Sequence, residues 1–245
     1  MKTFISKTTL LVTSLLLASA ALNAAEVTIS GAGSVARLLT SKKADIETKS
    51  GQTLTIKSKN TLIGIKDLIG GDANLAIISG PDKAVYKYAG LADDMAASLK
   101  ATVFHQDKLA FIVNPANPVS SLTKEQLISI FTGKTTNWKD VGGTDLAIRV
   151  LVVEKSNGFR LSADAALWGD DPLSGAQVSN KSSDVIPAVS HSPETISCIA
   201  STDVAPSVKV IGSPEIAIDM SFVSKGEPTA EEKAVIDAAR SIFMK

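Results

Sequence analysis

The chain has 245 residues, with 25 basic side chains, 25 acidic side chains and an aromatic content of 4%. It contains no run of lysines or arginines and no interleaved aromatic stripe, so the composition argues against nucleic-acid binding. Cys198 is the only cysteine, which excludes an intramolecular disulfide and a lipid-bearing cysteine near a cleavage site.

The first 24 residues have the pattern of a cleaved secretory signal. Lys2 and Lys7 precede an apolar stretch over residues 10–18, and Ala24 is the small residue that a signal peptidase requires. The apolar stretch is shorter than the roughly 20 residues of a membrane-spanning helix. We therefore expect residues 1–24 to be removed, leaving a periplasmic protein that does not insert into the membrane and is a monomer. Because the signal has two lysines and no acid, 23 basic side chains then face 25 acidic ones.

Strands and amphipathic helices alternate in the first third of the chain. Strands are predicted at residues 27–30, 54–56 and 75–78, and helices are predicted to begin at Ser34, as a cap, and at Thr61. The first helix places apolar side chains on one face: Val35, Leu38, Leu39 and Ile46. Continuous apolar strands separated by short helices indicate a parallel sheet that is covered on both sides.

The second half of the chain continues this pattern. Apolar strands are predicted at residues 109–113 and 148–153, and residues 169–194 are predicted to form a long loop with a short helix at most. Thr229 and Glu232 form a capping box that starts a final helix. The residues expected to face the core from this helix are Val235, Ile236, Ala239, Ile242 and Phe243.

The segment from Leu109 to Gly143 has a distinctive order of parts. Thr123 and Gln126 form a capping box, a buried helical face follows, and Gly133 ends the helix. With its flanking turns, the segment contains Asn117-Pro118, Ser121 to Thr123, Ile130 to Lys134 and Asn137 to Gly143. In this order it resembles the phosphate-type solute-binding proteins of bacterial ABC transporters.

The resemblance implies an α/β protein with the two-lobe type II periplasmic-binding-protein fold. Each lobe would contain a mostly parallel sheet flanked by helices, and a two-strand hinge would join the lobes. We expect residues 25–106 and 201–245 in the first lobe and residues 107–200 in the second. The crossings are placed near residues 104–110, in an irregular passage, and near residues 197–205.

The first candidate binding segment runs from strand to helix through Gly33, Ser34 and Val35. Glycine lets backbone N–H groups approach an anion closely, and a helix N-terminus presents unpaired donors. A glycine pair in a turn is also common without any ligand. The resemblance favours contact with ligand here.

The second candidate segment contains Asn60 and Thr61 at a helix start and Ser79 at a strand end. The resemblance puts Thr61 where a hydroxyl binds the oxyanion, with Gly64 as the glycine of that pattern. The alternative is that Asn60 or Thr61 only caps the helix. Phosphate-binding relatives often have an acid at the position of Ser79.

The third candidate segment is Asn157, Gly158, Phe159 and Arg160, in the place of a Ser-Gly-Thr-Arg signature. Two hydroxyls of that signature are absent, while the backbone N–H groups remain and Arg160 has a bidentate fork suited to an oxyanion. The alternative for Arg160 is a salt bridge to Asp164 one turn later. Phe159 either favours a ligand with an apolar part or closes the site.

An enzyme is not expected. His105 and His191 are isolated, Cys198 has the pattern of a small buried residue, and no motif for a metal or cofactor is present. The expected function is capture of a small oxyanion, most simply phosphate, for an ABC permease by hinge closure. The alternative is a family member that does not transport and serves as a periplasmic sensor or protein-interaction module.

Overall fold

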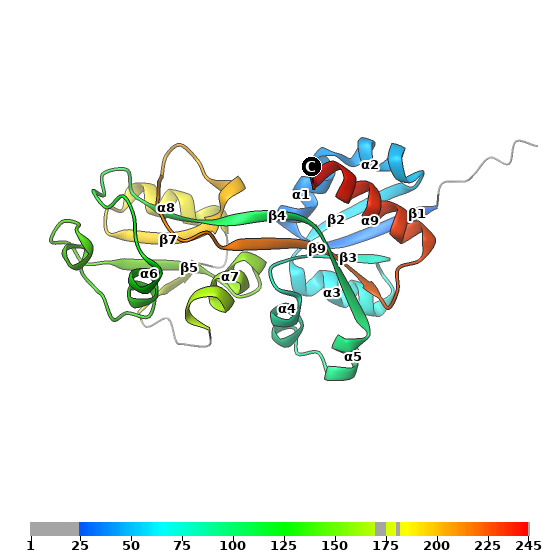
Figure 1. Ribbon diagram of the computed structural model, residues 1–245, viewed down its shortest axis with the longest axis horizontal. Coiled ribbons are helices and arrows are strands. Elements are labelled where there is room, and N and C mark those ends of the chain that lie inside the picture. Colours follow the sequence, from blue (N-terminus) through cyan, green and yellow to red (C-terminus); the bar gives the residue numbers. More distant parts are fainter. Residues whose placement is uncertain (1–24, 170–174, 180–181, 245) are drawn as a thin grey trace, which may run out of the picture.

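The computed structural model describes residues 25–169, 175–179 and 182–244, so the expected signal at residues 1–24 lies outside the described part of the chain. Two lobes are joined by two long strands (Figure 1). The strands are β1 (Glu26–Ala32), β2 (Thr53–Lys59), β3 (Leu75–Ser79), β4 (Leu99–Val113), β5 (Arg149–Val153), β6 (Gln177–Ser179), β7 (Thr195–Ala200), β8 (Lys209–Ile211) and β9 (Ala217–Lys225).

Short helices connect these strands. The α-helices are α1 (Gly33–Ser41), α2 (Lys43–Ser50), α3 (Thr61–Gly70), α4 (Asp82–Tyr88), α5 (Asp93–Ala97), α6 (Lys124–Phe131), α7 (Gly158–Ala163), α8 (Val185–His191) and α9 (Ala230–Phe243). The other helical turns are η1 (Trp138–Val141), η2 (Asp164–Trp168), η3 (Ser182–Asp184) and η4 (Ser201–Asp203). Within the described ranges, no helix combines the length and the apolar character needed to cross a membrane.

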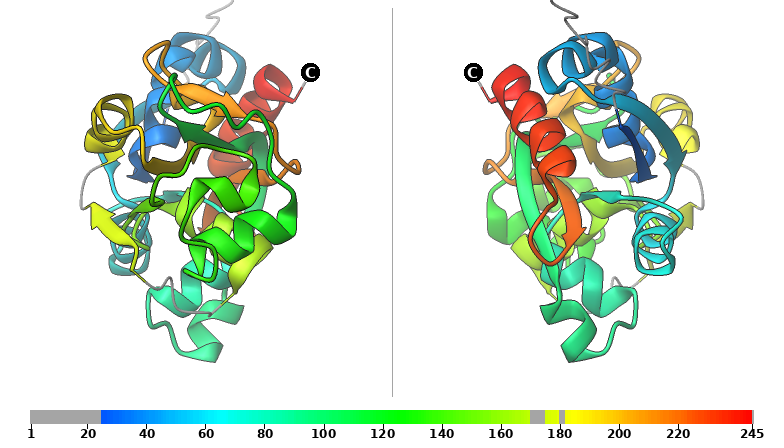
Figure 2. Two further views of the ribbon diagram at one scale, coloured as in Figure 1. Left: turned by 90° about the vertical axis from the view of Figure 1, so that its left-hand side faces the viewer. Right: turned by 90° about the vertical axis from the view of Figure 1, so that its right-hand side faces the viewer.

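The first lobe has a sheet covered on both faces, as predicted. Strands β2, β1 and β3 are parallel, and β9 and β4 continue the sheet in antiparallel pairs. One apolar cluster includes Ile29, Leu39 and Phe222, on the side of α1, α2 and α9. A second cluster, on the side of α3 and α4, includes Ile65 and Ile78. Helix α9 packs beside α2, so both ends of the described chain belong to this lobe (Figure 1 and Figure 2).

The second lobe has a parallel core of β7, β5 and β6, with β4 pairing antiparallel to β7 and β8. Its single apolar cluster includes the large rings of Phe111, Phe131, Trp138, Phe159 and Trp168. The rings of Phe131 and Trp168 are stacked with their centroids 4.7 Å apart. Apart from Leu161, which joins the cluster on the side of α3 and α4, each lobe therefore has its own core, and the α/β two-lobe fold is confirmed.

The hinge consists of β4 and β9, which pair over residues 99–108 of β4. The irregular passage expected at residues 104–108 is a register shift between Val103 and His105 inside a continuous strand. The return crossing lies later than the one expected near residues 197–205. Strand β8 pairs with Phe111 to Val113, and Ile216 and Ile218 join the second lobe's cluster. We therefore place the return crossing within β9.

Two of the predicted helix caps are present in the structure and a third is not. The capping boxes at Thr123 and Thr229 are both present. Ser34 was wrongly expected to cap a helix, because α1 already begins at Gly33 and Ala32 occupies the cap position without a side-chain hydrogen bond. The stretch expected to be a loop at residues 169–194 contains β6 as well as α8 among its described residues.

Candidate functional site

Two glycines bring the start of α3 against the end of β1. A Cβ atom on Gly64 would lie 2.5 Å from Gly31 Cα, far inside the distance at which carbon atoms pack. Gly31 itself has φ +144°, and a Cβ there would lie 2.1 Å from the carbonyl oxygen of Ile77. This close packing places Thr61, the first residue of α3, beside the turn that leads into α1.

A second glycine contact joins the two lobes. A Cβ atom on Gly158, the first residue of α7, would lie 1.7 Å from the carbonyl oxygen of Ser79, and one on Gly80 would lie 2.4 Å from the Gly158 oxygen. Leu161, also on α7, is buried in the first lobe's cluster with Ile78. The lobes are thus in direct contact where β3 ends and α7 begins.

A cavity of about 170 Å³ lies where these turns meet. Most of the predicted binding residues line it: Gly33, Ser34, Asn60, Thr61, Ser79, Asn157, Gly158 and Phe159. The side chain of Phe159 packs in the second lobe's core and is only 7% exposed, so it forms one wall and leaves the cavity open. All three predicted segments therefore converge.

One hydroxyl and one helix start at this cavity have no side-chain partner among the described residues. Thr61 is 2% exposed, and its hydroxyl oxygen makes no hydrogen bond. Asn60 is the side-chain cap of α3, because its Oδ1 accepts from Ile63 N at 2.8 Å, and this frees Thr61 from that role. Helix α1 has no side-chain cap at all, so its first N–H groups lack a capping acceptor.

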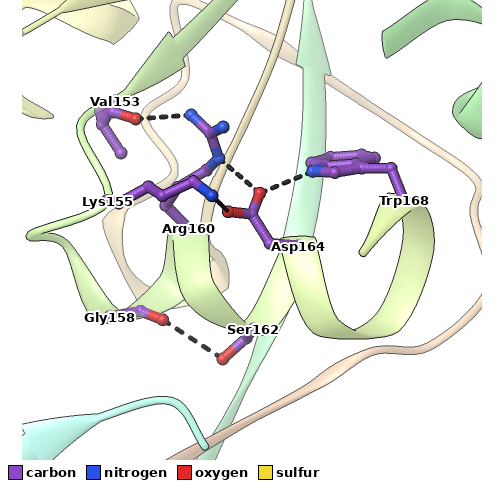
Figure 3. A network of polar contacts seen from close by, with 7 residues as sticks. All are labelled: Val153, Lys155, Gly158, Arg160, Ser162, Asp164 and Trp168. Atoms are coloured by element: carbon purple, nitrogen blue, oxygen red, sulfur yellow. Dashed lines mark hydrogen bonds and ion pairs between the residues drawn. The ribbon is translucent and has the colours of Figure 1, made fainter. Parts of the chain in front are cut away.

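Arg160 does not line the cavity, contrary to the prediction of a ligand contact. Its Nε donates to Asp164 Oδ1 at 2.6 Å and its Nη1 to the carbonyl oxygen of Val153 at 2.9 Å (Figure 3). Trp168 Nε1 donates to the same Asp164 oxygen at 2.6 Å. Lys155 Nζ lies 3.5 Å from Asp164 Oδ2, an ion-pair distance too long for a strong hydrogen bond. The alternative prediction, a structural salt bridge, describes Arg160.

Val35 also lies away from the cavity. Its side chain is completely buried in the first lobe's core with Leu39, because the helical face that carries Val35 packs on the sheet.

The cavity has further lining residues that were not among the predicted ligand contacts: Ala32, Arg37, Lys59, Ser156 and Asp203. Arg37 Nη2 donates to Asp203 Oδ1 at 2.9 Å. Arg37 follows Ser34 by three residues, a spacing that puts both on one helix face, and this was an available signal. Asp203 comes from η4, distant in sequence, and had no local signal.

Outside this cavity, the side chains to consider for reactivity are the cysteine and any cluster of metal-binding groups. Cys198 is buried in the second lobe, and burial raises the pKa of its thiol to about 12, which leaves it protonated and unreactive. Among residues 25–169, 175–179 and 182–244, no three of the histidine, cysteine and acidic side chains form a possible metal site.

Comparison with known proteins identifies the class. Residues 18–230 match the family model described as the PBP superfamily domain, so the chain belongs to the PBP superfamily. Within that superfamily it is a PstS-like protein. It is 32% identical over 161 residues to the phosphate-binding protein PstS of Bacillus subtilis, a match that covers 58% of this chain and 53% of that one. The matches cover 31% to 53% of the length of such curated relatives.

Solved structures agree over nearly the whole chain. A putative phosphate ABC transporter substrate-binding protein with bound phosphate from Clostridium perfringens has 26% identity and a TM-score of 0.72, covering 87% of this chain and 92% of that one. An ABC-type phosphate transport receptor from Vibrio cholerae has 27% identity and a TM-score of 0.68, covering 88% and 93%. Proteins of this class bind solutes without catalysing a reaction, in agreement with the expectation of a non-enzyme.

Proposed function

We propose that this protein captures a small oxyanion, phosphate foremost, in the periplasm and passes it to an ABC permease. The observation that carries the proposal is the buried Thr61 hydroxyl without a partner in the wall of the cavity between the lobes. An unsatisfied buried polar group costs about 1 to 3 kcal/mol. A ligand oxygen that accepts from this hydroxyl would recover that cost.

The charges and dipoles around the cavity suit an anion. Arg37 and Lys59 supply two cations, and α1 directs the positive end of its dipole toward the same space. Because residues of both lobes line the cavity, a ligand that contacts both favours the closed arrangement. A permease would then recognise the closed, ligand-bound arrangement of the two lobes.

Asp203 supports phosphate over sulfate. Its Oδ1 accepts from Arg37, and its Oδ2 has no hydrogen-bond partner among the described residues. Hydrogen phosphate carries a proton near neutral pH and sulfate carries none, so a free carboxylate oxygen favours the former. Phosphate-binding relatives often have an acid at the position of Ser79, and a serine has no carboxylate to accept the phosphate proton. Asp203 would supply that carboxylate from another element.

The periplasmic location rests on the signal pattern in residues 1–24, and the permease rests on relatives whose names describe phosphate ABC transporters. A sensor role without transport would use the same cavity and the same ligand.

Isothermal titration of the purified protein, dialysed into phosphate-free buffer, tests the proposal. We expect saturable binding of phosphate and binding of sulfate that is weaker by tenfold or more. In Asp203→Asn, Oδ1 still accepts from Arg37 while an amide replaces the free acceptor, so the preference should shift toward sulfate by about tenfold. A wild-type protein that binds no phosphate, sulfate, phosphonate or small carboxylate contradicts anion capture.

A further inference from the structure

We propose that Arg37, and not Arg160, is the arginine that binds the captured oxyanion, an inference that rests on the proposed function. Arg160 stands at the position of the signature arginine, but its side chain makes its hydrogen bonds inside the protein. Its guanidinium bonds to Asp164 and to the Val153 carbonyl, and the residue is 7% exposed. Moving it into the cavity would leave Asp164 buried without its main partner.

Arg37 has the opposite surroundings. It lines the cavity from the second turn of α1, and its side chain is 66% exposed. One nitrogen, Nη2, donates to Asp203, and the other N–H groups of the guanidinium have no hydrogen-bond partner among the described residues. A planar fork with free donors is suited to two oxygens of a tetrahedral anion.

Asp203 holds this fork in position, and a buried carboxylate fixes Asp203 in turn. Asp107, on β4, is 4% exposed and accepts hydrogen bonds from the hydroxyls of Ser201 and Thr202. These residues form η4 together with Asp203. Burial alone would raise the pKa of Asp107, but the bonds from Ser201, Thr202 and the Lys108 N–H outweigh burial and lower it, so the carboxylate stays charged.

The chain of contacts therefore runs from the hinge strand to the cavity. Asp107 anchors η4, η4 presents Asp203, and Asp203 aligns Arg37. Asp107 is thus a positioning residue, which acts on the ligand through η4, by way of Arg37 and of the Asp203 carboxylate. Because β4 is one of the two hinge strands, the placement of this arginine is tied to the part of the fold that connects the lobes.

The test compares arginine variants by isothermal titration with phosphate and with sulfate. Arg37→Ala should weaken both anions by at least tenfold, and Arg37→Lys should give an intermediate affinity because the charge stays and the fork is lost. Arg240→Ala is the matched control, since Arg240 is also exposed but lies on α9, outside the cavity lining. Its affinity should equal that of the wild type.

A second comparison tests Asp107 as a positioning residue. Asp107→Asn should weaken sulfate binding, in which Asp203 accepts no proton from the ligand, in the wild-type background and have little further effect in the Arg37→Ala background. If Asp107→Asn does not fold, Thr202→Val removes one of the same hydrogen bonds at an exposed position.

The outcomes separate the two proposals. A wild-type protein that binds phosphate, with Arg37→Ala at the same affinity, overturns the assignment of Arg37 and leaves anion capture intact. A wild-type protein that binds neither anion overturns both. Additive effects of Asp107→Asn and Arg37→Ala overturn the positioning role of Asp107.

Discussion

The two walls of the cavity differ in what their polar groups are bonded to. On the first-lobe wall, the Thr61 hydroxyl has no partner and Arg37 uses only part of its fork. Behind the second-lobe wall, Arg160 and Asp164 bond to each other, and Arg160 also bonds to the Val153 carbonyl of its own lobe. The first-lobe wall therefore keeps donors that a ligand could use, whereas the Arg160–Asp164 network stabilises the interior of the second lobe.

This difference shows the limit of matching sequence positions. The position of Arg160 corresponds to a signature arginine, yet its side chain is directed into the second lobe (Figure 3). The second wall contributes through main-chain proximity at Gly158 and apolar packing at Leu161. A sequence match places this segment beside the cavity, and the hydrogen bonds show whether its side chains are left free to meet a ligand.

The largest expected effect is on the stability of the second lobe, where Arg160 is assigned a structural role. In Arg160→Met the aliphatic stem stays and the charge of Asp164 loses its main partner. We expect the free energy of unfolding to fall by about 3 kcal/mol, as measured by urea denaturation. Adding Asp164→Asn should recover most of this loss, because Asn keeps an acceptor for Trp168 and removes the unpaired charge. An unchanged unfolding midpoint in the single variant would contradict a structural role for Arg160.

Gly158 tests whether the close contact between the lobes is needed for binding. In Gly158→Ala the added Cβ would meet the Ser79 carbonyl at 1.7 Å, so the lobes cannot approach as closely. Phosphate affinity should fall by about a hundredfold, since the binding-competent closed form becomes rare. Titration measures the affinity, and small-angle scattering should show a larger radius of gyration. Gly70→Ala is a control, because its Cβ meets nothing closer than 3.6 Å; equal affinities for the two variants would mean that this contact is not needed.

Substitution of Thr61 tests the first-lobe wall and is expected to give the smallest effects. The stability of the ligand-free protein should rise, while the affinity for phosphate should fall. Thr61→Val keeps the shape and removes the unpaired hydroxyl, so the ligand-free protein should gain about 1 kcal/mol of stability. Phosphate affinity should nevertheless fall by about tenfold, because a donor to the anion is lost. Thr61→Ser retains the hydroxyl and should bind normally. A stabilised Thr61→Val protein with unchanged affinity would show that the hydroxyl does not meet the ligand.

Local features of the fold were predictable from the sequence. The two capping boxes use residues three apart, and the buried strands β3 and β5 are short apolar runs, so each signal lies within a few residues. The convergence of the first two segments was also predictable, because parallel strands end at the same edge of a sheet, and the resemblance to a two-lobe fold placed the third segment opposite them.

Features that depend on distant contacts were not predictable. Arg37 and Asp203 are 166 positions apart in sequence, and nothing near Asp203 indicates a role in binding. The direction of Arg160 depends on Asp164 and on the end of β5, and the spacing alone left two readings open. The return crossing was misplaced because the pairing of β8 with Phe111 to Val113 has no local pattern.

The continuous strand β4 also restricts how the molecule opens. Its pairing with β9 makes a two-stranded ribbon between the lobes, and the same strand then pairs with β7 and β8 beyond it. A ribbon held by backbone hydrogen bonds bends more readily than its two strands slide past each other. Opening should therefore occur by bending of this ribbon, so that the strand register between the lobes is the same in the open and closed arrangements.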